Sequence, residues 1–267
     1  MLTALQRKDK GFFYFETHSG RGAYDLSQGG TEAEGGVSRF SATANNSEEL
    51  QRYARRLEEY RAKQGSRRAY PGSPLIAASE LRPQDRAVLV ELVPAEARAL
   101  EVAVAYNPQM RVEQGDGFDR LRAWLPPAER RGLTFIDPPY EETGRDFERV
   151  TGAIVEALRR FRTGIIAAWY PIKDERDIAA WQAGLAQTLD GPEYRGPANR
   201  RPAYRCETLV AELWLYPRDS RVGLNGSGLL IVNPPYLLAE RMRVWLPELQ
   251  TQLDAGQAGG TSIRLLV

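Results

Sequence analysis

The stretch Leu133-Thr134-Phe135-Ile136-Asp137-Pro138-Pro139-Tyr140 decides the fold, because an apolar run ends there in an acid, two prolines and an aromatic residue. The run at 133–136 is typical of a buried strand, and two prolines with fixed φ angles make the turn after it rigid. Ligands of open α/β sheets bind beyond the carboxyl ends of the strands. The stretch therefore predicts an α/β sheet with a ligand site at Asp137.

Six further apolar runs alternate with helical patterns along the chain. The runs lie at 12–15, 87–92, 111–114, 165–170, 208–216 and 229–232, and the helical patterns at 95–106, 146–161 and 174–189. Such alternation predicts a mostly parallel sheet, here of seven strands, with helices on both faces. The last two strands follow each other without a helix, so we expect an antiparallel hairpin at one edge of the sheet.

Residues 23–69 break this alternation. A Gly-rich run at 28–36 precedes a helical pattern in which Asn46 and Glu49 have the spacing of a capping box. The apolar face of this helix comprises Leu50, Tyr53, Ala54, Leu57 and Tyr60. We predict a small helical insertion subdomain at 23–69 on a Rossmann-like core made of 1–22 and 70–267.

The composition of the 267 residues excludes several classes of protein. With 42% apolar residues and 27% charged residues of both signs, the chain is typical of a globular protein and not of a disordered one. One cysteine and one histidine exclude a Cys/His zinc cluster, and no apolar run approaches the roughly 18 residues of a membrane span. We expect a soluble cytoplasmic monomer that binds neither a metal nor a membrane.

Arginine supplies 32 of the 36 basic side chains, against 35 acidic ones. Its planar guanidinium suits phosphate oxygens, although a genome rich in G and C produces the same bias. One group lies on the face of the insertion helix opposite its apolar face and just after it: Arg52, Arg55, Arg56, Arg67 and Arg68. We predict that this group contacts nucleic-acid phosphates, the alternative being a solvated helix face. Six arginines between 194 and 223 form a second candidate.

The turn after 133–136 has the chemistry of a site for an exocyclic amine. Asp137 and the carbonyl group of Pro138 can accept both hydrogens of the amine, and Tyr140 offers a ring on which a planar base can stack. The turn resembles the (D/N)-P-P-(Y/F/W) motif of amino-group methyltransferases that use S-adenosylmethionine. We therefore predict Asp137, Pro138 and Tyr140 as catalytic residues.

A second copy of this motif, Asn233-Pro234-Pro235-Tyr236, follows the apolar run at 229–232. Chain order favours the first copy, because a methyltransferase core needs three more strands after its catalytic turn. Asp137 leaves 130 residues for them, whereas Asn233 leaves 34. We expect the second copy to be a strand-end turn near the same rim of the sheet.

Acidic residues also end three earlier predicted strands. Glu16 precedes a Gly-x-Gly loop, in which glycine lets the backbone approach a ligand. Glu91 ends the second strand and can bind both hydroxyls of a ribose. Asp116 follows the third strand and can accept a hydrogen bond from an adenine amine while Phe118 packs on the ring. Three acids at successive strand ends predict a nucleoside site.

Together these residues resemble the RlmJ family of ribosomal RNA large-subunit adenine-N6 methyltransferases, from about residue 10 to residue 267. The similar motifs are Glu16-Thr17-His18-Ser19-Gly20, Tyr70-Pro71-Gly72-Ser73-Pro74-Leu75, Glu91-Leu92-Val93-Pro94, Asp116-Gly117-Phe118, Asp137-Pro138-Pro139-Tyr140-Glu141, Trp169-Tyr170-Pro171 and 227–235. The resemblance implies a class I S-adenosylmethionine-dependent methyltransferase core and methyl transfer to N6 of one adenine in 23S rRNA.

The same resemblance implies cofactor contacts at His18, Ser73, Glu91, Asp116 and Gly117, with Asp137 as the acceptor at the target amine. His18 is expected at the methionine end of the cofactor and not as a general base. The full set of predicted cofactor residues is Glu16, His18, Gly20, Ser73, Glu91, Asp116, Gly117, Phe118 and Asp137.

Two features depart from the family's pattern. The family carries an N-terminal stretch with histidines and a Gly-Asn pair that closes over the cofactor and reaches the RNA, whereas here the first predicted strand already begins at residue 12. We expect an upstream start, a shortened chain, or a weak or inactive member. Val93 stands where the family usually has His, outside the contacts named above.

Two alternative functions stay open. A DNA adenine-N6 methyltransferase would use the same turn, although an insertion of 47 residues is small for reading a duplex. A non-catalytic RNA- or nucleotide-binding protein would keep the fold without the reaction, and cofactor binding would distinguish it.

Overall fold

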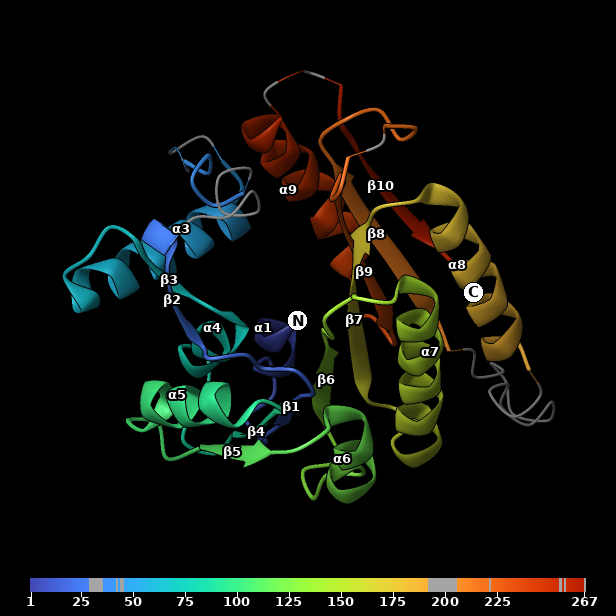
Figure 1. The fold of residues 1–267 in the computed structure, drawn as a ribbon. Coiled ribbons are helices and arrows are strands. Elements are labelled where there is room, and N and C mark those ends of the chain that lie inside the picture. Colours follow the sequence, from blue (N-terminus) through green and yellow to red (C-terminus); the bar gives the residue numbers. More distant parts are fainter. Residues whose placement is uncertain are drawn as a thin grey trace.

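The computed structural model describes residues 1–28, 36–41, 43, 46–191, 206–220, 222–254, 256 and 258–266. Its centre is an eight-stranded sheet with the strand order β10-β8-β9-β7-β6-β1-β4-β5 (Figure 1). The strands are β1 (Phe13–Glu16), β4 (Arg86–Glu91), β5 (Met110–Gln114), β6 (Gly132–Ile136), β7 (Ile165–Ile172), β8 (Thr208–Trp214), β9 (Gly226–Val232) and β10 (Gly260–Leu265).

All seven predicted strands are present, but the expected number of seven is wrong because β10 adds an eighth. Its sequence, Gly-Thr-Ser-Ile-Arg-Leu, has no apolar run, and its residues are partly or fully exposed. An edge strand that buries so little leaves only a weak hydrophobic pattern in the sequence.

The five strands from β5 through β4, β1 and β6 to β7 run parallel. The other three add antiparallel pairs: β7 with β9, β9 with β8, and β8 with β10. The predicted hairpin of β8 and β9 therefore forms, but not at the edge, since β9 inserts between β7 and β8 and β10 lies outside β8. The parallel part has the strand order of a doubly wound nucleotide-binding sheet, which confirms the Rossmann-like core.

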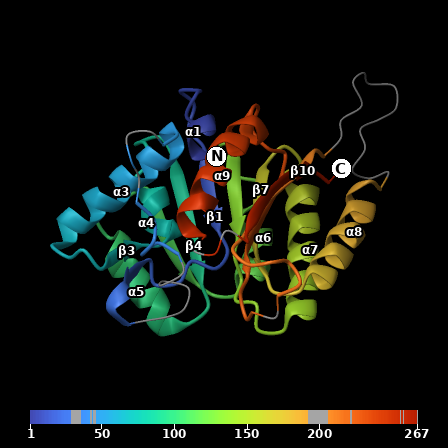
Figure 2. The ribbon, with the colours of Figure 1, turned by 90° about the horizontal axis from the view of Figure 1, so that it is seen from above.

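Helices cover both faces of this sheet (Figure 2). One face packs against α6 (Gly117–Trp124), α7 (Thr143–Arg160) and α8 (Glu175–Leu189), and the other against α4 (Ser73–Ala78), α5 (Pro94–Val104) and α9 (Leu238–Leu253). Side chains alternate along β1 accordingly: Phe13 and Phe15 join the first core, while Tyr14 joins the second. The three predicted core helices are confirmed as α5, α7 and α8.

The segment between β1 and α4 leaves the main sheet. Here β2 (Ala23–Asp25) and β3 (Ala69–Pro71) pair antiparallel with each other, with η1 (Leu26–Gln28) and α3 (Glu48–Gln64) between them. Most of the Gly-rich run lies outside the described residues. The division into a core and an insertion at 23–69 stays a prediction.

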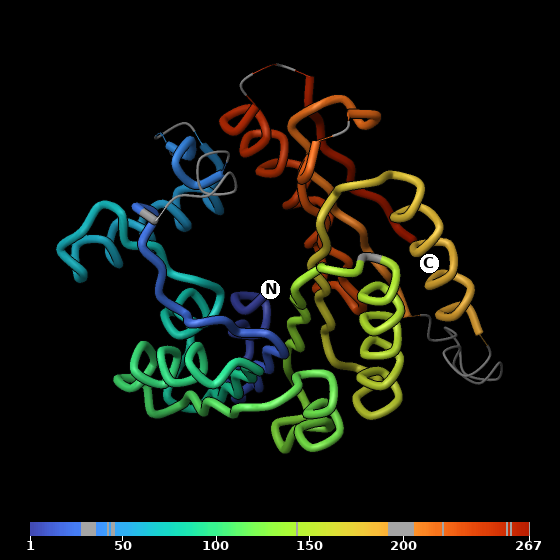
Figure 3. Tube along the Cα trace, viewed as in Figure 1, coloured from blue at the N-terminus to red at the C-terminus, as the bar shows by residue number. Residues whose placement is uncertain are grey.

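The insertion helix α3 lies beside α9 (Figure 3). Arg241 Nε on α9 donates to Glu49 Oε1 at 2.7 Å, so Glu49 forms an ion pair between α3 and α9. The predicted capping box is wrong: Ser47 occupies the N-cap position of α3 without a side-chain cap bond, and the side chain of Asn46 accepts from the backbone N–H of Thr43 at 2.7 Å.

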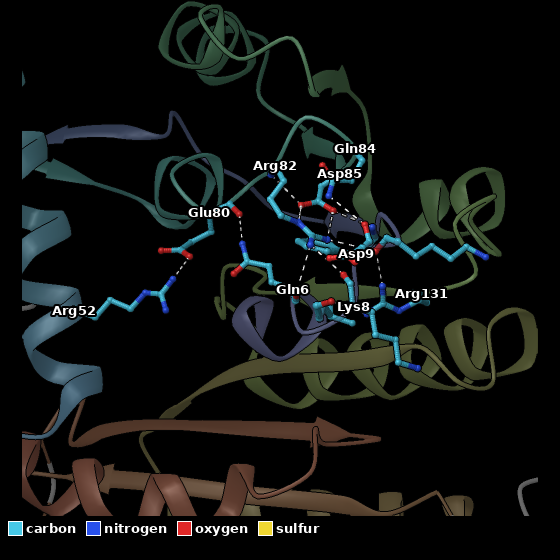
Figure 4. A network of polar contacts seen from close by, with 12 residues as sticks. Gln6, Lys8, Asp9, Arg52, Glu80, Arg82, Gln84, Asp85 and Arg131 are labelled. Atoms are coloured by element: carbon cyan, nitrogen blue, oxygen red, sulfur yellow. Dashed lines mark hydrogen bonds and ion pairs between the residues drawn. The ribbon is translucent and has the colours of Figure 1, made fainter.

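The amino ends of the parallel strands form one edge of the sheet, the amino edge, and α1 (Leu2–Leu5) lies just before it. Arginine side chains bind the backbone of this N-terminal segment (Figure 4). Arg82 donates to the carbonyl groups of Gln6 and Lys8 at 3.3 and 3.0 Å, and Arg131 donates to those of Leu5 and Lys10, both at 2.6 Å. These bonds fix the N-terminal segment to the residues that precede β4 and β6.

Candidate functional site

The four predicted acids lie at the opposite edge, the carboxyl edge of the sheet. Glu16 and Glu91 are the last residues of β1 and β4, and Asp116 and Asp137 follow β5 and β6. These strands are neighbours and run parallel, in the order β5-β4-β1-β6, so their ends meet at one edge. The structure therefore brings the predicted acids to the same edge.

Glu16 is completely buried at this edge. The hydroxyl of Tyr14 donates to its Oε2 at 2.8 Å, and the hydroxyl of Ser73 donates to its Oε1. Burial raises the pKa of Glu16 to about 8, helped by the nearby charge of Asp137 and opposed by the two hydroxyl groups. The carboxyl group of Glu16 is therefore neutral at pH 7, and it is hydrogen-bonded to Ser73, the first residue of α4.

Glu91 holds the loop after β1. The backbone N–H of Gly20 donates to its Oε2 and that of Val93 to its Oε1, both at 2.8 Å. Gly20 has a φ of 59°, a left-handed conformation that glycine adopts without strain. A carboxylate has about four acceptor positions, so Glu91 keeps two for a ligand such as the hydroxyls of a ribose. Val93 itself is exposed.

Gly117 marks the closest approach of the next loop. A Cβ atom at Gly117 would lie 1.8 Å from the carbonyl oxygen of Thr17, so only glycine lets the start of α6 pack on the end of β1. Asp116 caps α6, and its Oδ1 accepts from the N–H of Phe118 at 2.9 Å. The loop thereby places Asp116 and Phe118 beside the loop after β1.

His18 lies against this second loop. Its ring meets that of Phe118 edge to face with 4.7 Å between the centroids, and its Nδ1 is 2.8 Å from the hydroxyl oxygen of Thr17. Burial lowers the pKa of His18 to about 4, with Asp116 opposing the shift and Arg149 adding to it. The imidazole is therefore neutral at pH 7.

Arg149, on α7, was not identified from the sequence. Its Nη2 donates to Asp116 Oδ2 at 2.7 Å, and its guanidinium carbon lies 4.4 Å from the centre of the Phe118 ring. No local pattern predicts this contact, because 33 residues separate the two partners of the ion pair.

The turn after β6 is held by side chains of and after β7. Pro138 is buried, and Asp137 is partly buried. The hydroxyl of Tyr140 donates to the carbonyl oxygen of Trp169 at 2.6 Å, and Lys173 Nζ donates to that of Tyr140 at 2.9 Å. The Tyr140 ring is 8% exposed and packs on Trp169 and on Phe147, so little of it remains for a stacked base.

The second Pro-Pro turn lies at the amino edge, so the expectation that it shares a rim with the first is wrong. In the antiparallel pairing of β7 with β9, Val232 stands opposite Ile166, near the start of β7. The side chain of Asn233 donates to the carbonyl groups of Arg162 and Gly164 at 2.9 and 2.8 Å. Strand direction, which the sequence does not show, places this turn.

Ser19 supports a bound ligand at the carboxyl edge. Its hydroxyl oxygen is buried and has no hydrogen-bond partner in the structure. A buried hydroxyl without a partner costs free energy, which a polar ligand would recover. The donor and acceptor set of Ser19, Ser73, Glu91 and Asp116 fits the hydroxyls, amine and amino-acid end of an adenosyl cofactor.

The predicted phosphate-binding arginines divide into two groups. Arg52 and Arg56 both pair with Glu80, Arg52 at hydrogen-bond distance and Arg56 at 3.2 Å, so they face the protein and not only solvent. Arg55, Arg67 and Arg68 are exposed. Five of the six arginines between 194 and 223 lie outside the described residues, and the sixth, Arg218, pairs with buried Glu212 at 2.9 Å.

Comparison with known proteins identifies the family. The family model described as "Ribosomal RNA large subunit methyltransferase D, RlmJ" matches residues 9–267. The chain belongs to this family. As an RlmJ-family protein it is 35% identical over 271 residues to ribosomal RNA large subunit methyltransferase J of Escherichia coli strain K12, covering 100% of this chain and 91% of that protein.

Two further relatives agree. The methyltransferase J of Haemophilus influenzae is 37% identical over 267 residues, covering 98% of this chain and 89% of that protein. The crystal structure of protein LPL1258 from Legionella pneumophila superimposes with a TM-score of 0.83 at 32% identity, covering 98% of this chain and 91% of that one. The RlmJ-family fold therefore extends over nearly the whole chain.

The described residues contain neither a metal cluster nor a membrane-spanning helix. No three His, Cys, Asp or Glu side chains among them are grouped to hold a metal ion. No helix in the described part of the chain is both long and apolar enough to cross a membrane.

Proposed function

We propose that this RlmJ-family protein transfers a methyl group from S-adenosylmethionine to N6 of an adenine in 23S rRNA. The observation that carries the proposal is the Asp137-Pro138 turn at the carboxyl edge, beside the buried Glu16. The same motif at the amino edge lies away from the ends of β1, β4 and β5, so the first turn is the one beside the predicted cofactor residues. Family membership supports ribosomal RNA over DNA as the substrate.

The chain's own residues would hold the cofactor along the carboxyl edge. Glu91 would bind the ribose hydroxyls with its two remaining acceptor positions, and Asp116 the adenine amine. His18 would contact the methionine end as a neutral ring, and Ser19 would gain a partner for its buried hydroxyl. Gly117 lets the start of α6 pack against the loop after β1, because a Cβ atom there would collide with the carbonyl oxygen of Thr17.

S-adenosylmethionine supplies an electrophilic methyl group on a sulfonium sulfur. The lone pair of an adenine N6 is delocalised into the ring, so the amine is a poor nucleophile. Asp137 and the carbonyl of Pro138 accept its two hydrogens and thereby localise the lone pair. Such hydrogen-bond and proton acceptance contributes about 10²- to 10⁴-fold to a rate. The base must first leave its stack, at a cost of a few kcal/mol.

The turn is rigid before the substrate arrives. Two prolines restrict its φ angles. Lys173 donates to the carbonyl group of Tyr140, and the hydroxyl of Tyr140 donates to the carbonyl group of Trp169. Glu16 is neutral at pH 7 and so adds no second negative charge beside Asp137. This arrangement orients one ionisable acceptor toward the amine, which lowers the entropic part of the barrier.

Methyl transfer from labelled S-adenosylmethionine to large-subunit RNA tests the proposal. The RNA comes from a strain that lacks its own homologue, and digestion should yield labelled N6-methyladenosine. Duplex DNA is the matched second substrate, and faster labelling of DNA would favour the DNA alternative. Cofactor binding without any labelling of RNA would favour the non-catalytic alternative.

We also propose that the protein acts as a monomer in the cytoplasm.

A further inference from the structure

Arg149 links the helix after the catalytic turn to the loop predicted to bind adenine. It lies on α7, which begins at Thr143 shortly after the turn at Asp137. Its guanidinium pairs with Asp116 Oδ2 at 2.7 Å and lies over the Phe118 ring at 4.4 Å. The other oxygen of Asp116 accepts the Phe118 N–H, so Arg149 binds both side chains of a single turn.

These contacts restrict the two side chains but leave acceptor positions on Asp116 for a ligand. The Asp116 carboxylate has about four acceptor positions and uses two of those positions, so an amine can still bind. The guanidinium lies over the Phe118 ring, which also makes an edge-to-face contact with His18. A ligand that meets side chains already held in one rotamer loses less entropy on binding.

We propose that Arg149 is a positioning residue that fixes Asp116 and Phe118 for the adenine end of S-adenosylmethionine. This inference rests on the proposed function, because it assumes an adenosyl cofactor at the carboxyl edge. Arg149 acts through these two side chains.

Arg145 offers a matched control on the same helix, about one turn earlier. Its guanidinium pairs with Glu142 at 2.9 Å, and its side chain is 79% exposed, compared with 52% for Arg149. Replacing either arginine with glutamine removes one positive charge from α7. Only the Arg149 change removes contacts with Asp116 and Phe118.

Isothermal titration with S-adenosylhomocysteine measures the effect without requiring activity. We expect Arg149→Gln to weaken binding about five- to thirtyfold, the cost of ordering two side chains on binding. Arg145→Gln should stay within about twofold of the wild type, by the small value of exposed ion pairs. Arg149→Lys, which keeps the charge but lacks the planar face, should recover part of the loss.

A second ligand locates the effect at the adenine end of the site. 5′-Methylthioadenosine has the adenine but no amino-acid end, so Arg149→Gln should weaken its binding by the same factor. In methyl transfer, KM for the cofactor should rise while kcat stays within about twofold. Arg149 is expected to affect cofactor binding equally in the ground state and in the transition state.

Three results would overturn the inference. These are equal affinity of Arg149→Gln and the wild type, an equal loss for Arg145→Gln, or an Arg149→Lys variant as weak as Arg149→Gln. Failure of the proposed function gives different results. A wild type that does not bind S-adenosylhomocysteine would contradict the cofactor assignment, and a wild type that binds it but labels no RNA would contradict methyl transfer while leaving the role of Arg149 unchanged.

Discussion

Two turns of nearly the same sequence lie at opposite edges of the sheet. Asp137-Pro138-Pro139-Tyr140 follows β6 at the carboxyl edge, where the acids at the ends of β1 and β4 and after β5 also lie. Asn233-Pro234-Pro235-Tyr236 follows β9 at the amino edge, because β9 runs antiparallel to β7. A four-residue motif therefore does not define a site by itself, and the direction of the preceding strand decides what it can meet.

The two turns also differ in the burial and bonding of their side chains. The Tyr140 ring is buried and its hydroxyl is bonded to the strand beside it, whereas the Tyr236 ring is 80% exposed. Asn233 has a φ of 53° and donates its amide hydrogens to two backbone carbonyl groups. The turn at the amino edge thus closes a strand end, while the turn at the carboxyl edge is packed into a site.

The largest expected effect compares the two turns directly. Asp137→Ala should reduce methyl transfer about 10²- to 10⁴-fold, because the amine loses its charged acceptor, with cofactor affinity within a few-fold of the wild type. Asn233→Ala should keep its activity and lose about 2 kcal/mol of unfolding free energy through two hydrogen bonds and a strained φ. Methyl-transfer rates and thermal melts measure both, and equal loss of activity would break the comparison.

A second prediction extends the comparison along the carboxyl edge. Glu91→Ala should weaken cofactor binding by about 1.5–3 kcal/mol, or roughly ten- to 150-fold, because ribose hydroxyls lose a charged partner. Titration calorimetry measures this. Glu91→Gln keeps acceptor capacity in one oxygen and should lose less. An unchanged affinity in the alanine variant would mean that Glu91 serves only the backbone of Gly20 and Val93.

A third prediction concerns the arginines, which the structure divides between the protein and solvent. Replacing Arg55, Arg67 and Arg68 with Gln should flatten the dependence of log K for RNA on log salt by about two units, at roughly 0.7 for each phosphate contact. The matched change of Arg52 and Arg56 should instead lower Tm, since it leaves Glu80 without its ion pairs. Parallel salt lines for the triple variant and wild type would show a solvated helix face.

A fourth prediction is a pH dependence of stability at Glu16. Its pKa rises from 4.5 in the unfolded chain to about 8 in the folded protein. Between these values the folded protein holds a proton that the unfolded chain has released, so stability falls as the pH rises through this window. The glutamine side chain of Glu16→Gln cannot ionise. The Tm of this variant, relative to that of the wild type, should therefore be several degrees higher at pH 9 than at pH 5. A constant difference across thermal melts at both pH values would contradict the raised pKa.

The local sequence determined the strands and their carboxyl-terminal acids. Most of the predicted strands carry an apolar run because they lie in the core, whereas β5 at the edge has no buried residue, and Glu16, Glu91, Asp116 and Asp137 stand at or just after strand ends. Parallel strands then require such ends to meet. This is why most of the candidate site could be proposed before the structure was known, and why β10, which buries little, was missed.

Contacts between distant segments were decided only by the tertiary structure. The pairing of β9 with β7 moved Asn233 to the amino edge, Arg149 met Asp116 across 33 residues, and Ser73 met Glu16 across 57. None of these contacts leaves a local pattern, because a side chain's partner depends on strand order and helix packing. Local periodicity reports whether a residue is buried, and only the assembled sheet determines which residue lies beside it.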